Sequence, residues 1–551
     1  MATPLLNYFL AILLAALVTH YAWRRLQLSL AKHRSLAGHS RMAKRVAGLL
    51  PGYSYDETRF FSADDAPAEV VAKRREGFQR LAHGFLERHP KSIAQSIAAG
   101  ERISDLQFTR AYRVPFPFSR YFRENLKVGG FVSTSEGVTI SDLDGHRFYD
   151  LSGSYGVNVM GYDFYKRCMA EASERVKDLG PVLGSFHPCV AWNAEKLCQI
   201  SRKDEVSFHM SGTEAVMQAV RLARYHTRRK FLVRFCGAYH GWWDDVQPGP
   251  GNPQPPGKTY TLKEMDEATL RVLRTRTDIA CVLVNPIQAL HPNAAAPGDS
   301  SLVDSSRRAG FDREAYTAWL KRLREVCTAR RIVLIFDEVF LGFRLGPGGA
   351  QAYFGVEADL VTYGKTLGGG LPVGVVCGRK DLMKRFREER PADICFARGT
   401  FNSHPHVMAA MQVFLERLES EEVKELYRGL DERWNRRAAA LNERLRAAHL
   451  PVQVANLSSV WTVFYTVPSR YNWMLQFYLR SEGLALSWIG TGRLIFSLNF
   501  TEGDFEAVAT RFVRAAQAMQ NDGWWWERPG ATNREIRRNI LKEAFWQRPR
   551  N

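Results

Sequence analysis

The chain has 551 residues, of which 45% are hydrophobic and 24% charged, and its formal net charge is +19. This composition excludes a largely disordered chain, and the length predicts two or more packed units rather than one simple core. The positive charge either favours an anionic partner, such as phospholipid or nucleic acid, or reflects a generally basic composition. The eight cysteines form no CxxC pair, so we predict neither a metal site nor a disulfide framework.

The N-terminal segment, residues 1–23, is predicted to be a transmembrane anchor. Residues 4–23 carry no charge, and twenty helical residues rise about 30 Å, which matches the hydrocarbon core of a bilayer. Trp23 stands at the interface end, and Arg24 and Arg25 follow it directly. Under the positive-inside rule, a single pass leaves the bulk of the chain cytoplasmic. Membrane lipid is therefore one predicted partner.

Three other interpretations of this segment fit less well. A cleaved signal peptide would carry a positive region before its apolar run, and this chain carries none there. A buried core helix does not explain the abrupt border at Arg24 and Arg25. A helix lying in the plane of the interface needs a polar face, and little beyond Asn7, Thr19 and His20 is available to form one.

Residues 24–125 are predicted to be a basic, mainly helical extension next to the membrane. Polar, basic helical patterns cover Ala68–Arg88 and Ile93–Phe108, and the proline-containing stretch Val114–Phe118 breaks the periodicity as a connector does. No chemistry can be assigned to this region. We expect it to form a collar at the membrane or a contact between two copies of the chain.

From residue 126 onward the pattern becomes that of a layered α/β protein. Residues 126–205 contain a predicted hairpin, and residues 206–400 contain short apolar strands that alternate with amphipathic helices. Such alternation is typical of a mainly parallel sheet. The hairpin strands are Val138–Ser141 and Arg147–Leu151, and the clearest strands after residue 200 are Phe231–Phe235, Ile279–Val284, Ile332–Phe336 and Val373–Cys377.

The C-terminal part is predicted to be a second, smaller α+β domain over residues 401–515. A tryptophan-rich basic tail, residues 516–551, follows it. Trp524, Trp525 and Trp526 favour either an interfacial membrane contact or a packing patch against a second copy. The predicted elements of the small domain are helices at Val407–Leu418 and Glu421–Ala447 and strands near Val460–Tyr465 and Leu494–Leu498.

Two charged residues stand in segments where a charge is unexpected. Asp337 ends the strand IVLIF, where a carboxylate is costly unless it is paired or functional. Lys365 lies in VTYGKTLGGG, whose glycines allow the backbone to approach a bound molecule closely. A lysine held in such a site loses solvation and its pKa falls, which makes it a nucleophile toward an aldehyde. The alternatives are an ion pair or helix cap for Asp337 and a flexible surface loop for Lys365.

Two further segments offer binding groups for a flat, phosphorylated molecule. Ser211, Gly212 and Thr213 open a helix, and free amides and hydroxyls at a helix N-terminus bind phosphate, although an ordinary N-cap needs no ligand. Tyr239 and His240 follow the strand FLVRF. An aromatic ring at that position either stacks on a heterocycle or packs in the core.

Together and in this order, these segments resemble the class III, fold-type I aminotransferases that depend on pyridoxal phosphate, and among them the glutamate-1-semialdehyde aminomutase-like members. The resemblance covers about residues 128–515. It implies a large domain with a mainly parallel, seven-stranded sheet, a small α+β domain, and pyridoxal 5′-phosphate as cofactor. It rests on GVTISDLDGHRFYDLSGSYG, SFHMSGTEA, GAYHGWWD, FDEVFLGFRLGPGGAQAYFGVEADLVTYGKTLGGGLPVG, RGTFNSHPHVMAA and FSLNFTEGDFEAV.

The resemblance also implies roles for individual residues. Lys365 becomes the Schiff-base lysine and moves a proton between the substrate and the cofactor. Asp337 holds the pyridine nitrogen protonated, which lets the ring draw electrons from the substrate. Val339 packs on one face of the ring, and Tyr239 stacks on the other face with His240 beside it.

The same resemblance implies that two segments of the chain contact the phosphate of a cofactor. Ser211, Gly212 and Thr213 match the phosphate-binding turn. Thr400, with Gly399, matches the residue that reaches the phosphate of the neighbouring subunit's cofactor. A homodimer with shared active sites is therefore implied.

Several positions depart from the family pattern. Asn285-Pro286 stands where relatives have Glu-Pro, so the donor to the cofactor's 3-hydroxyl is open between Gln288 and Asn293. Phe340 follows the DEV motif in place of Gln or Met, and Tyr155 falls in the strand that lines the substrate pocket. These departures leave the cofactor unchanged and put the substrate in question.

These observations favour a membrane-anchored aminotransferase that moves an amino group from a donor amine or amino acid to an aldehyde or ketone. The anchor motivates a hydrophobic or lipid-like acceptor. An aminomutase that isomerises one substrate is the alternative on the same cofactor. A degenerate scaffold is disfavoured because Asp337 and Lys365 are both present. Nucleic acid is not expected as a partner, since the chain has no recognition module for it.

Overall fold

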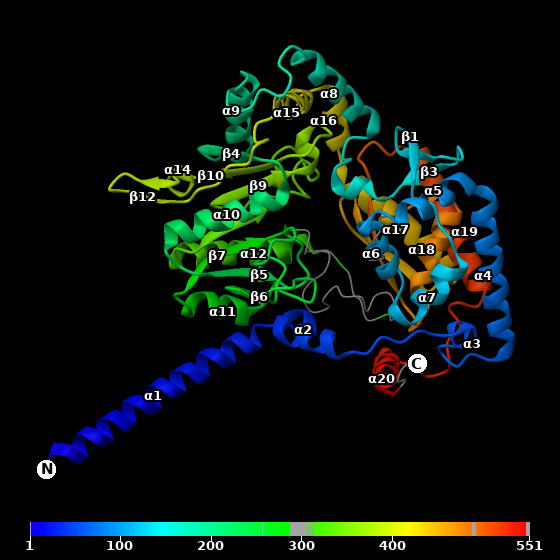
Figure 1. The fold of residues 1–551 in the computed structure, drawn as a ribbon, viewed down its shortest axis with the longest axis horizontal. Helices are drawn as coiled ribbons and strands as arrows, with labels where there is room; N and C mark the ends of the chain where they lie inside the picture. The colour runs from blue at the N-terminus through cyan, green and yellow to red at the C-terminus, as the bar shows by residue number, and fades with distance from the viewer. Residues whose placement is uncertain are drawn as a thin grey trace.

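A computed structural model of the chain describes residues 2–255, 257–286, 305, 310, 312–486 and 492–546. Figure 1 shows two lobes, which we call the large and the small domain, with a long N-terminal helix projecting from the large domain. Residues 57–125 of the helical extension and the C-terminal end lie on the small domain, whereas Lys44, in the first part of the extension, donates to the Asn252 carbonyl of the large domain over 2.6 Å.

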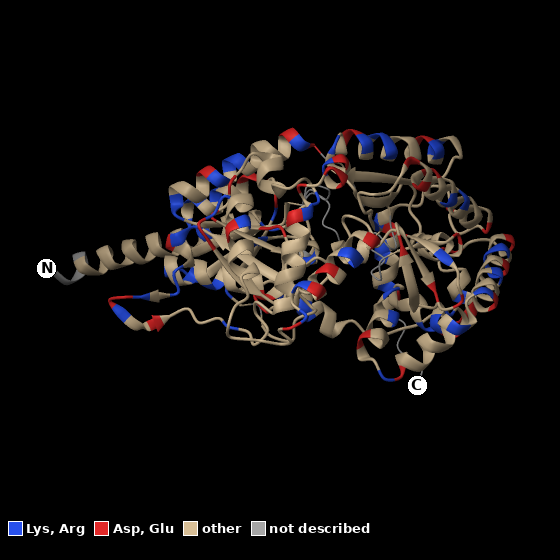
Figure 2. Ribbon diagram, turned by 90° about the horizontal axis from the view of Figure 1, so that it is seen from above, with Lys and Arg blue, Asp and Glu red and all other residues tan. Residues whose placement is uncertain are grey.

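The N-terminal helix α1, Ala2–Leu30, leaves the protein as a rod (Figure 1). A 25-residue stretch of it is long and apolar enough to cross a membrane, and Figure 2 shows it without charged residues for most of its length. Its C-terminal end packs on α11, Glu267–Thr275, where the Thr275 hydroxyl donates to Gln27 Oε1 over 3.3 Å. The next residue after the helix, Ala31, is fully buried. The rod is thereby attached to the large domain.

Six α-helices follow before residue 126, and the predicted helix Ala68–Arg88 is confirmed as α4. The single predicted helix Ile93–Phe108 is wrong, because Gly100 ends α5 and leaves room for the Arg110 guanidinium of α6. The predicted connector Val114–Phe118 is also wrong, since its prolines start α7, where a missing N–H is tolerated. The helices are α2 (Ser40–Leu49), α3 (Glu57–Phe61), α4 (Ala68–Arg88), α5 (Pro90–Gly100), α6 (Ser104–Tyr112) and α7 (Phe116–Asn125).

The extension and the small domain share one aromatic core. The ring centroids of Phe61 and Trp524 are 6.1 Å apart, and those of Phe118 and Trp473 are 5.3 Å apart. Trp524 is fully buried and Trp525 is 6% exposed. The membrane contact predicted for these two tryptophans is therefore wrong, and they pack inside their own chain rather than against a second copy.

The large domain is built on a seven-stranded sheet in the order β4-β10-β9-β8-β7-β5-β6. β10 runs antiparallel to both of its neighbours and the other pairs are parallel, so the predicted fold class is confirmed. Leu232 belongs to the core beneath α10 and Val233 to the core beneath α12, so the two helices cover opposite faces. The elements are β4 (Glu205–His209), α10 (Gly212–Thr227), β5 (Phe231–Phe235), β6 (Thr259–Leu262), β7 (Ile279–Val284), α12 (Arg313–Arg330), β8 (Val333–Asp337), β9 (Leu360–Gly364) and β10 (Gly374–Gly378).

Every strand of this sheet except β10 ends at the same edge, because β4 and β9 both run antiparallel to β10. Ligand sites of open α/β sheets form outside the carboxyl ends of the strands. The residues that follow these ends include Ser211 after β4, Tyr239 and His240 after β5, Asn285 after β7, Val339 after β8 and Lys365 after β9.

The small domain combines two sheets, β1-β2-β3-β15 and β13-β14-β16, with long helices. The single predicted helix Glu421–Ala447 is wrong, because it breaks before Gly429, whose φ of +57° disfavours a side chain. The predicted strand Leu494–Leu498 is found only at Arg493–Ile495. The elements are β1 (Val132–Glu136), β2 (Thr139–Asp142), β3 (Arg147–Asp150), α16 (Glu421–Tyr427), α17 (Leu430–Ala447), β13 (Val452–Leu457), β14 (Val460–Tyr465), α18 (Leu475–Ser481), β15 (Leu484–Ala485), β16 (Arg493–Ile495), α19 (Glu502–Asn521) and α20 (Asn533–Trp546).

The remaining elements connect the domains or lie on their surface. A hairpin of β11 and β12 projects from the large domain (Figure 1). These elements are η2 (Gly153–Gly156), α8 (Tyr162–Arg175), α9 (Cys189–Ser201), α13 (Gly349–Phe354), η5 (Lys365–Gly368), α14 (Lys380–Met383), β11 (Phe386–Arg387), β12 (Arg390–Ile394) and α15 (Pro405–Arg417).

Candidate active site

Asp337 lies at the end of β8 and is 3% exposed. Its carboxylate accepts three hydrogen bonds, from His240 Nδ1 over 2.7 Å, the Val339 amide over 3.1 Å and the Thr362 hydroxyl over 3.3 Å. Thr362 faces Asp337 in the register of β8 and β9. The carboxylate is therefore fixed in orientation by groups from two strands and from the turn after β5.

His240 is 2% exposed, and burial lowers its pKa although Asp337 opposes the shift. The ring is neutral at pH 7, and we assign the proton to Nδ1, the nitrogen that faces the carboxylate. Nε2 is buried and makes no hydrogen bond with any described residue. A neutral histidine thus leaves one acceptor nitrogen free in the site.

Lys365 follows β9 with a φ of +49°, and its Nζ donates to the Tyr155 carbonyl over 2.5 Å. Burial lowers the pKa of Lys365, Asp337 opposes the shift, and Arg344 adds to it. The Nζ also lies 5.5 Å from the centroid of the Phe340 ring. The amine is held in place beside an aromatic ring, and its neutral form is accessible at a lower pH than for a free lysine.

The start of α10 and the end of β9 meet at Val339. A Cβ placed on Gly212 would lie 2.6 Å from Val339 Cγ1, and a Cβ placed on Gly364 would lie 3.2 Å from the same atom. Ser211 is the N-cap of this 16-residue helix, and its hydroxyl accepts from the Glu214 amide over 3.2 Å. The absence of a side chain on the two glycines lets Val339 pack directly against the start of α10 and the end of β9. The first amides of α10 have no partner within the helix, as is general at a helix N-terminus, and such amides can bind an anion.

Tyr239 stands on the turn after β5 and its side chain is 65% exposed. Its carbonyl accepts from the Asn285 side-chain amide over 3.3 Å. Asn285, where the sequence departs from the family pattern, therefore holds the turn that carries Tyr239 and His240. Gln288 and Asn293, the two alternatives for the 3-hydroxyl donor, lie outside the described residues.

Tyr155 does not lie in a strand, and that part of its predicted placement is wrong. It belongs to the 3-10 turn η2, in which Ser154 and Tyr155 take φ values of +45° and +58°. The reversal of the chain turns the Tyr155 carbonyl toward Lys365. Phe340 packs on the same turn, because a Cβ on Gly156 would lie 2.6 Å from its Cε2.

Gly399 and Thr400 are not brought to this site within one chain. They lie between β12 and α15, Thr400 is exposed, and no described contact joins it to Lys365 or Ser211. Their predicted role in a neighbouring subunit's site stays a prediction.

Arg344 and Thr362 belong to the site, although neither was singled out from the sequence. Arg344 is fully buried, and it donates to the Phe496 carbonyl over 2.6 Å and the Ser459 hydroxyl over 2.7 Å. Burial lowers its pKa to about 10. The only sequence signals that could have pointed to them are their positions: Arg344 lies shortly after the DEV motif, and Thr362 lies three residues before Lys365.

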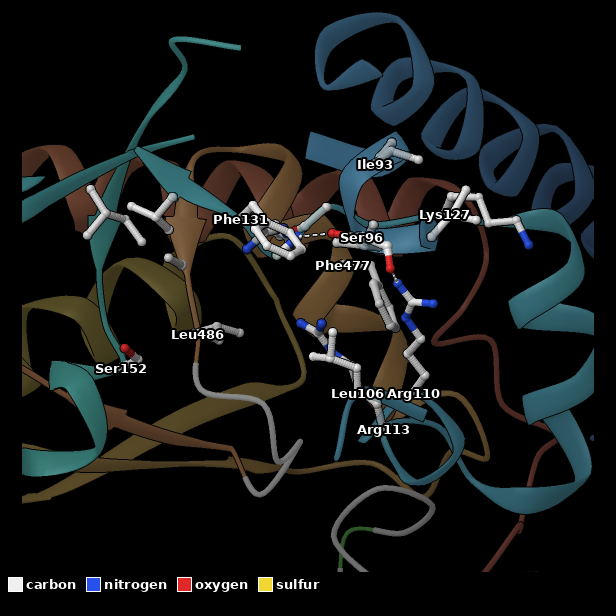
Figure 3. Close-up of a pocket in the computed structure, with 18 of the residues that line it drawn as sticks. Ile93, Ser96, Leu106, Arg110, Arg113, Lys127, Phe131, Ser152, Phe477 and Leu486 are labelled. Carbon is white, nitrogen blue, oxygen red and sulfur yellow. Dashed lines mark hydrogen bonds between the residues drawn. The ribbon is translucent and has the colours of Figure 1, made fainter. Parts of the chain in front are cut away.

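A cavity of about 1430 Å³ has Tyr155 in its lining, the residue whose carbonyl accepts from Lys365. Figure 3 shows part of its lining. It is bounded by α5, α6 and α7 of the extension on one side and by α18 and η2 on the other. The extension therefore reaches the neighbourhood of the site, which the sequence did not indicate.

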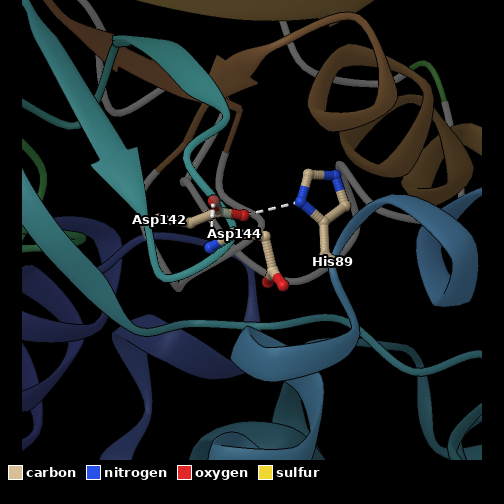
Figure 4. Close-up of side chains that lie close together, drawn as sticks. All are labelled: His89, Asp142 and Asp144. Carbon is tan, nitrogen blue, oxygen red and sulfur yellow. Dashed lines mark hydrogen bonds and ion pairs between the residues drawn. The ribbon is translucent and has the colours of Figure 1, made fainter.

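A second cluster, His89, Asp142 and Asp144, joins the extension to the turn between β2 and β3 (Figure 4). His89 Nδ1 lies 2.6 Å from Asp142 Oδ2, and Asp144 accepts from the amides of Lys91 and Ser92 over 3.0 and 2.9 Å. Backbone amides already satisfy these carboxylates, so the cluster holds the extension in place.

The fold and this site define an enzyme of the fold-type I class that depends on pyridoxal phosphate. The chain belongs to the class III aminotransferases, because the family model "Aminotransferase class-III" matches residues 121–246 and 270–515. It is 30% identical over 414 residues to a glutamate-1-semialdehyde 2,1-aminomutase of Geotalea daltonii, covering 71% of this chain and 88% of the relative. Another such aminomutase, from Syntrophus aciditrophicus, is 31% identical over 418 residues, covering 73% of this chain and 90% of the relative.

Solved structures give the same assignment. A β-phenylalanine aminotransferase from Variovorax paradoxus aligns with a TM-score of 0.64 and 25% identity, over 83% of this chain and 99% of that one. An omega-transaminase from Sphaerobacter thermophilus aligns with a TM-score of 0.62 and 25% identity, over 79% of this chain and 99% of that one. The chain is thus a class III aminotransferase with pyridoxal phosphate as its cofactor, as predicted.

Proposed function

We propose that the protein is a membrane-anchored aminotransferase with a hydrophobic or lipid-like acceptor. Water replaces the amine on the donor carbon, which becomes a carbonyl, and the acceptor's carbonyl oxygen leaves as water while a new C–N bond forms. The donor carbon is oxidised by two electrons and the acceptor carbon is reduced by two. The catalytic part rests on two groups at one sheet edge: the half-buried amine of Lys365, whose pKa is lowered, and the buried, hydrogen-bonded carboxylate of Asp337.

The residues of the sheet edge fit pyridoxal phosphate. When bound, the cofactor supplies an electron sink for the substrate carbon. We assign to Lys365 the covalent attachment of the cofactor and the transfer of a proton at that carbon. Asp337 would pair with the ring nitrogen, and His240 fixes the orientation of that carboxylate. Ser211, Gly212 and Thr213 would hold the phosphate at the start of α10, and Val339 and Tyr239 would contact the ring.

We further propose a homodimer with shared active sites. Thr400 is exposed and makes no described contact with the site of its own chain. The surrounding segment also exposes apolar side chains, as an interface before assembly does. More than half of the side chain is exposed for Phe386, Ile394, Phe396 and Phe401. Gly399 and Thr400 would thus complete the phosphate site of the partner.

The membrane part of the proposal rests on α1. The helix is long and apolar enough to span a bilayer, and the basic residues Arg24 and Arg25 follow its apolar part. This arrangement supports a single pass with the catalytic domains on the cytoplasmic side. A site held close to the bilayer gives access to acceptors that partition into it.

The alternative is an aminomutase that isomerises one substrate without an external donor. The relatives named above are aminomutases, which favours this alternative, and the departures at Asn285 and Phe340 favour a different substrate. An assay for donor dependence separates the two. Product formed only when a second amine is present supports the aminotransferase, and turnover without any donor supports the aminomutase.

The attachment site is tested by reducing the full-length protein with borohydride and mapping the cofactor on its peptides. We expect the cofactor on the peptide of Lys365, and no attachment in Lys365→Ala. The matched control is Lys203→Ala, because burial also lowers the pKa of Lys203, which is 8% exposed and lies away from the site. Attachment at another lysine in the wild type would overturn the catalytic assignment.

A further inference from the structure

The cavity that Tyr155 lines has both apolar and positively charged residues in its lining, part of which Figure 3 shows. Ile93, Leu106, Phe131 and Leu486 contribute apolar surface from four different segments of the chain. Its volume of about 1430 Å³ exceeds the range of about 300–1,000 Å³ that is usual for small-molecule sites. A small polar amino acid would leave most of this space unfilled.

The charged residues of the lining all have the same sign. They are Arg110, Arg113, Arg123, Lys127, Lys166 and Arg480, and no aspartate or glutamate lines the cavity within the described chain. Lys166 is paired with Asp163, at 2.9 Å. The other five form no ion pair with a carboxylate in the part of the chain that the structure describes. A cavity with several unpaired cations recognises an anion.

Arg113 and Arg480 lie near enough to each other to interact electrostatically. Arg113 Nε donates to Gln476 Oε1 over 3.2 Å, and its guanidinium lies 5.4 Å from the centroid of Phe477. Arg480 donates to the Gly129 carbonyl over 2.6 Å. The hydrogen-bond partners of both guanidinium groups are neutral, and Arg480 interacts with the carboxylate of Asp142 only at long range, without an ion pair. Neither positive charge is therefore taken up by a direct ion pair. Burial lowers the pKa of each to about 10, and both stay charged at pH 7.

The apolar side of the cavity is open to solvent. Ile97 and Ile103 line it and are 44% and 42% exposed. An apolar chain can therefore enter along these residues, while the wall at Tyr155 borders the amine of Lys365.

We propose that this cavity binds an anionic single-chain amphiphile, with its acyl chain against the extension and its negative group at Arg113 and Arg480. The idea that this ligand accepts the amino group rests on the proposed function. Binding of the ligand in the cavity can be tested separately from catalysis.

The test uses the full chain in phosphatidylcholine nanodiscs and a hexadecanoate that carries a photoreactive diazirine. We expect labelling of peptides from residues 93–131 and 477–486. Unlabelled hexadecanoate should compete, whereas hexadecan-1-ol and butanoate at the same concentration should not. Equal competition by the alcohol would overturn the anion site, and equal competition by butanoate would overturn the acyl site.

Two variants and one control sharpen the result. Arg113→Gln combined with Arg480→Gln should reduce labelling at least about tenfold, the effect of losing charge-assisted hydrogen bonds. Ile97→Glu, at an exposed position that tolerates substitution, should weaken labelling independently. Arg120→Gln is the control, because this α7 arginine pairs with Glu124 on the surface and does not line the cavity. Unchanged labelling in both variants would contradict the proposal.

The outcome is separable from that of the proposed function. Donor-dependent amino transfer to short aldehydes without labelling of the cavity would overturn this inference alone. Wild-type protein that attaches no cofactor at Lys365 would overturn the proposed function, and labelling would still report on the cavity.

Discussion

His240 donates from Nδ1 to Asp337 Oδ2 over 2.7 Å, and both side chains are buried at the edge where β5 and β8 end. A buried carboxylate is costly unless it is satisfied, and here Val339 and Thr362 supply the remaining donors. The network fixes the carboxylate without neutralising it, because His240 is neutral. Asp337 therefore stays available for a positively charged partner such as a protonated ring nitrogen.

Replacing this charge should affect catalysis more than folding. We expect Asp337→Asn to lower amino-transfer activity on the order of a hundredfold or more, the scale for removing a preorganised electrostatic group. The matched control is Asp359→Asn, another buried aspartate, which pairs with Arg324 and Arg379 at 2.9 Å each. That variant should lose thermal stability and keep its activity per folded molecule. Equal activity losses in the two variants would contradict the role of Asp337.

The lowered pKa of Lys365 has a kinetic consequence. Only the neutral amine attacks an aldehyde. The rate at which the cofactor attaches to cofactor-free protein should therefore rise with pH, and the midpoint of this rise should lie below pH 10.5. Asp337 raises the pKa of Lys365, so Asp337→Asn should move the midpoint to lower pH. Stopped-flow absorbance over a pH series measures it. A shift to higher pH would show that the two charges are not coupled in this way.

The buried strands were the most predictable part of the fold. Phe231–Phe235 and Ile279–Val284 were predicted with the observed bounds, and Ile332–Phe336 and Val373–Cys377 are displaced by one residue. A strand buried on both faces of a sheet appears in the sequence as an apolar run with clear ends. The family resemblance singled out Asp337 and Lys365, and the structure brings the two near enough to interact electrostatically. The roles that the resemblance implies for them stay predictions.

The wrong predictions concern places where contacts with other segments of the chain determine the local structure. The Arg110 guanidinium occupies the space beside Gly100, so α5 and α6 fold back on each other. Phe61 packs against Trp524, although the two residues lie near opposite ends of the sequence. Tyr155 takes a positive φ although it is not glycine, so no sequence signal marks its turn.

Removing the N-terminal helix should release the protein from membranes in two distinguishable ways. A chain lacking residues 1–23 should stay folded and move to the soluble fraction, because it loses only the exposed part of α1. A chain lacking residues 1–31 should also lose stability, since Gln27 and Ala31 are buried on the large domain. Membrane pelleting and thermal unfolding measure the two effects. Persistent pelleting of the shorter deletion would locate membrane binding elsewhere.

The C-terminal helix α20 should be stabilised by one acidic residue in a pH-dependent way. Burial alone would raise the pKa of Glu543, but Arg470, Tyr55 and Arg59 hold it at about 2. Its contribution is present above pH 4.5, the unfolded value, and is lost as the pH falls toward 2. Glu543→Gln should cost about 3 kcal/mol at pH 7, the scale for breaking a buried pair.

The measurement for Glu543 is thermal unfolding of both proteins over a pH series. The difference between wild type and Glu543→Gln should shrink on acidification below pH 4.5. Glu535→Gln on the same helix is the control, because its pair with Arg528 is more exposed and worth about 1 kcal/mol or less. A difference that stays constant with pH would show that the variant acts through packing instead.

Mixing an inactive variant with a weakened one tests whether Thr400 serves the partner's site. Lys365→Ala subunits should have no activity, and Thr400→Ala subunits should lose about tenfold or more through a missing bond to the charged phosphate. In a mixed dimer with shared sites, one site would combine an intact Lys365 with an intact Thr400 and recover about half of the activity. Lys365→Ala mixed with Asp337→Asn is the control and should recover nothing, because both residues belong to the same chain's site. If Thr400 acts within its own chain, the first mixture will also fail to recover, since its one intact lysine then lies beside the altered threonine.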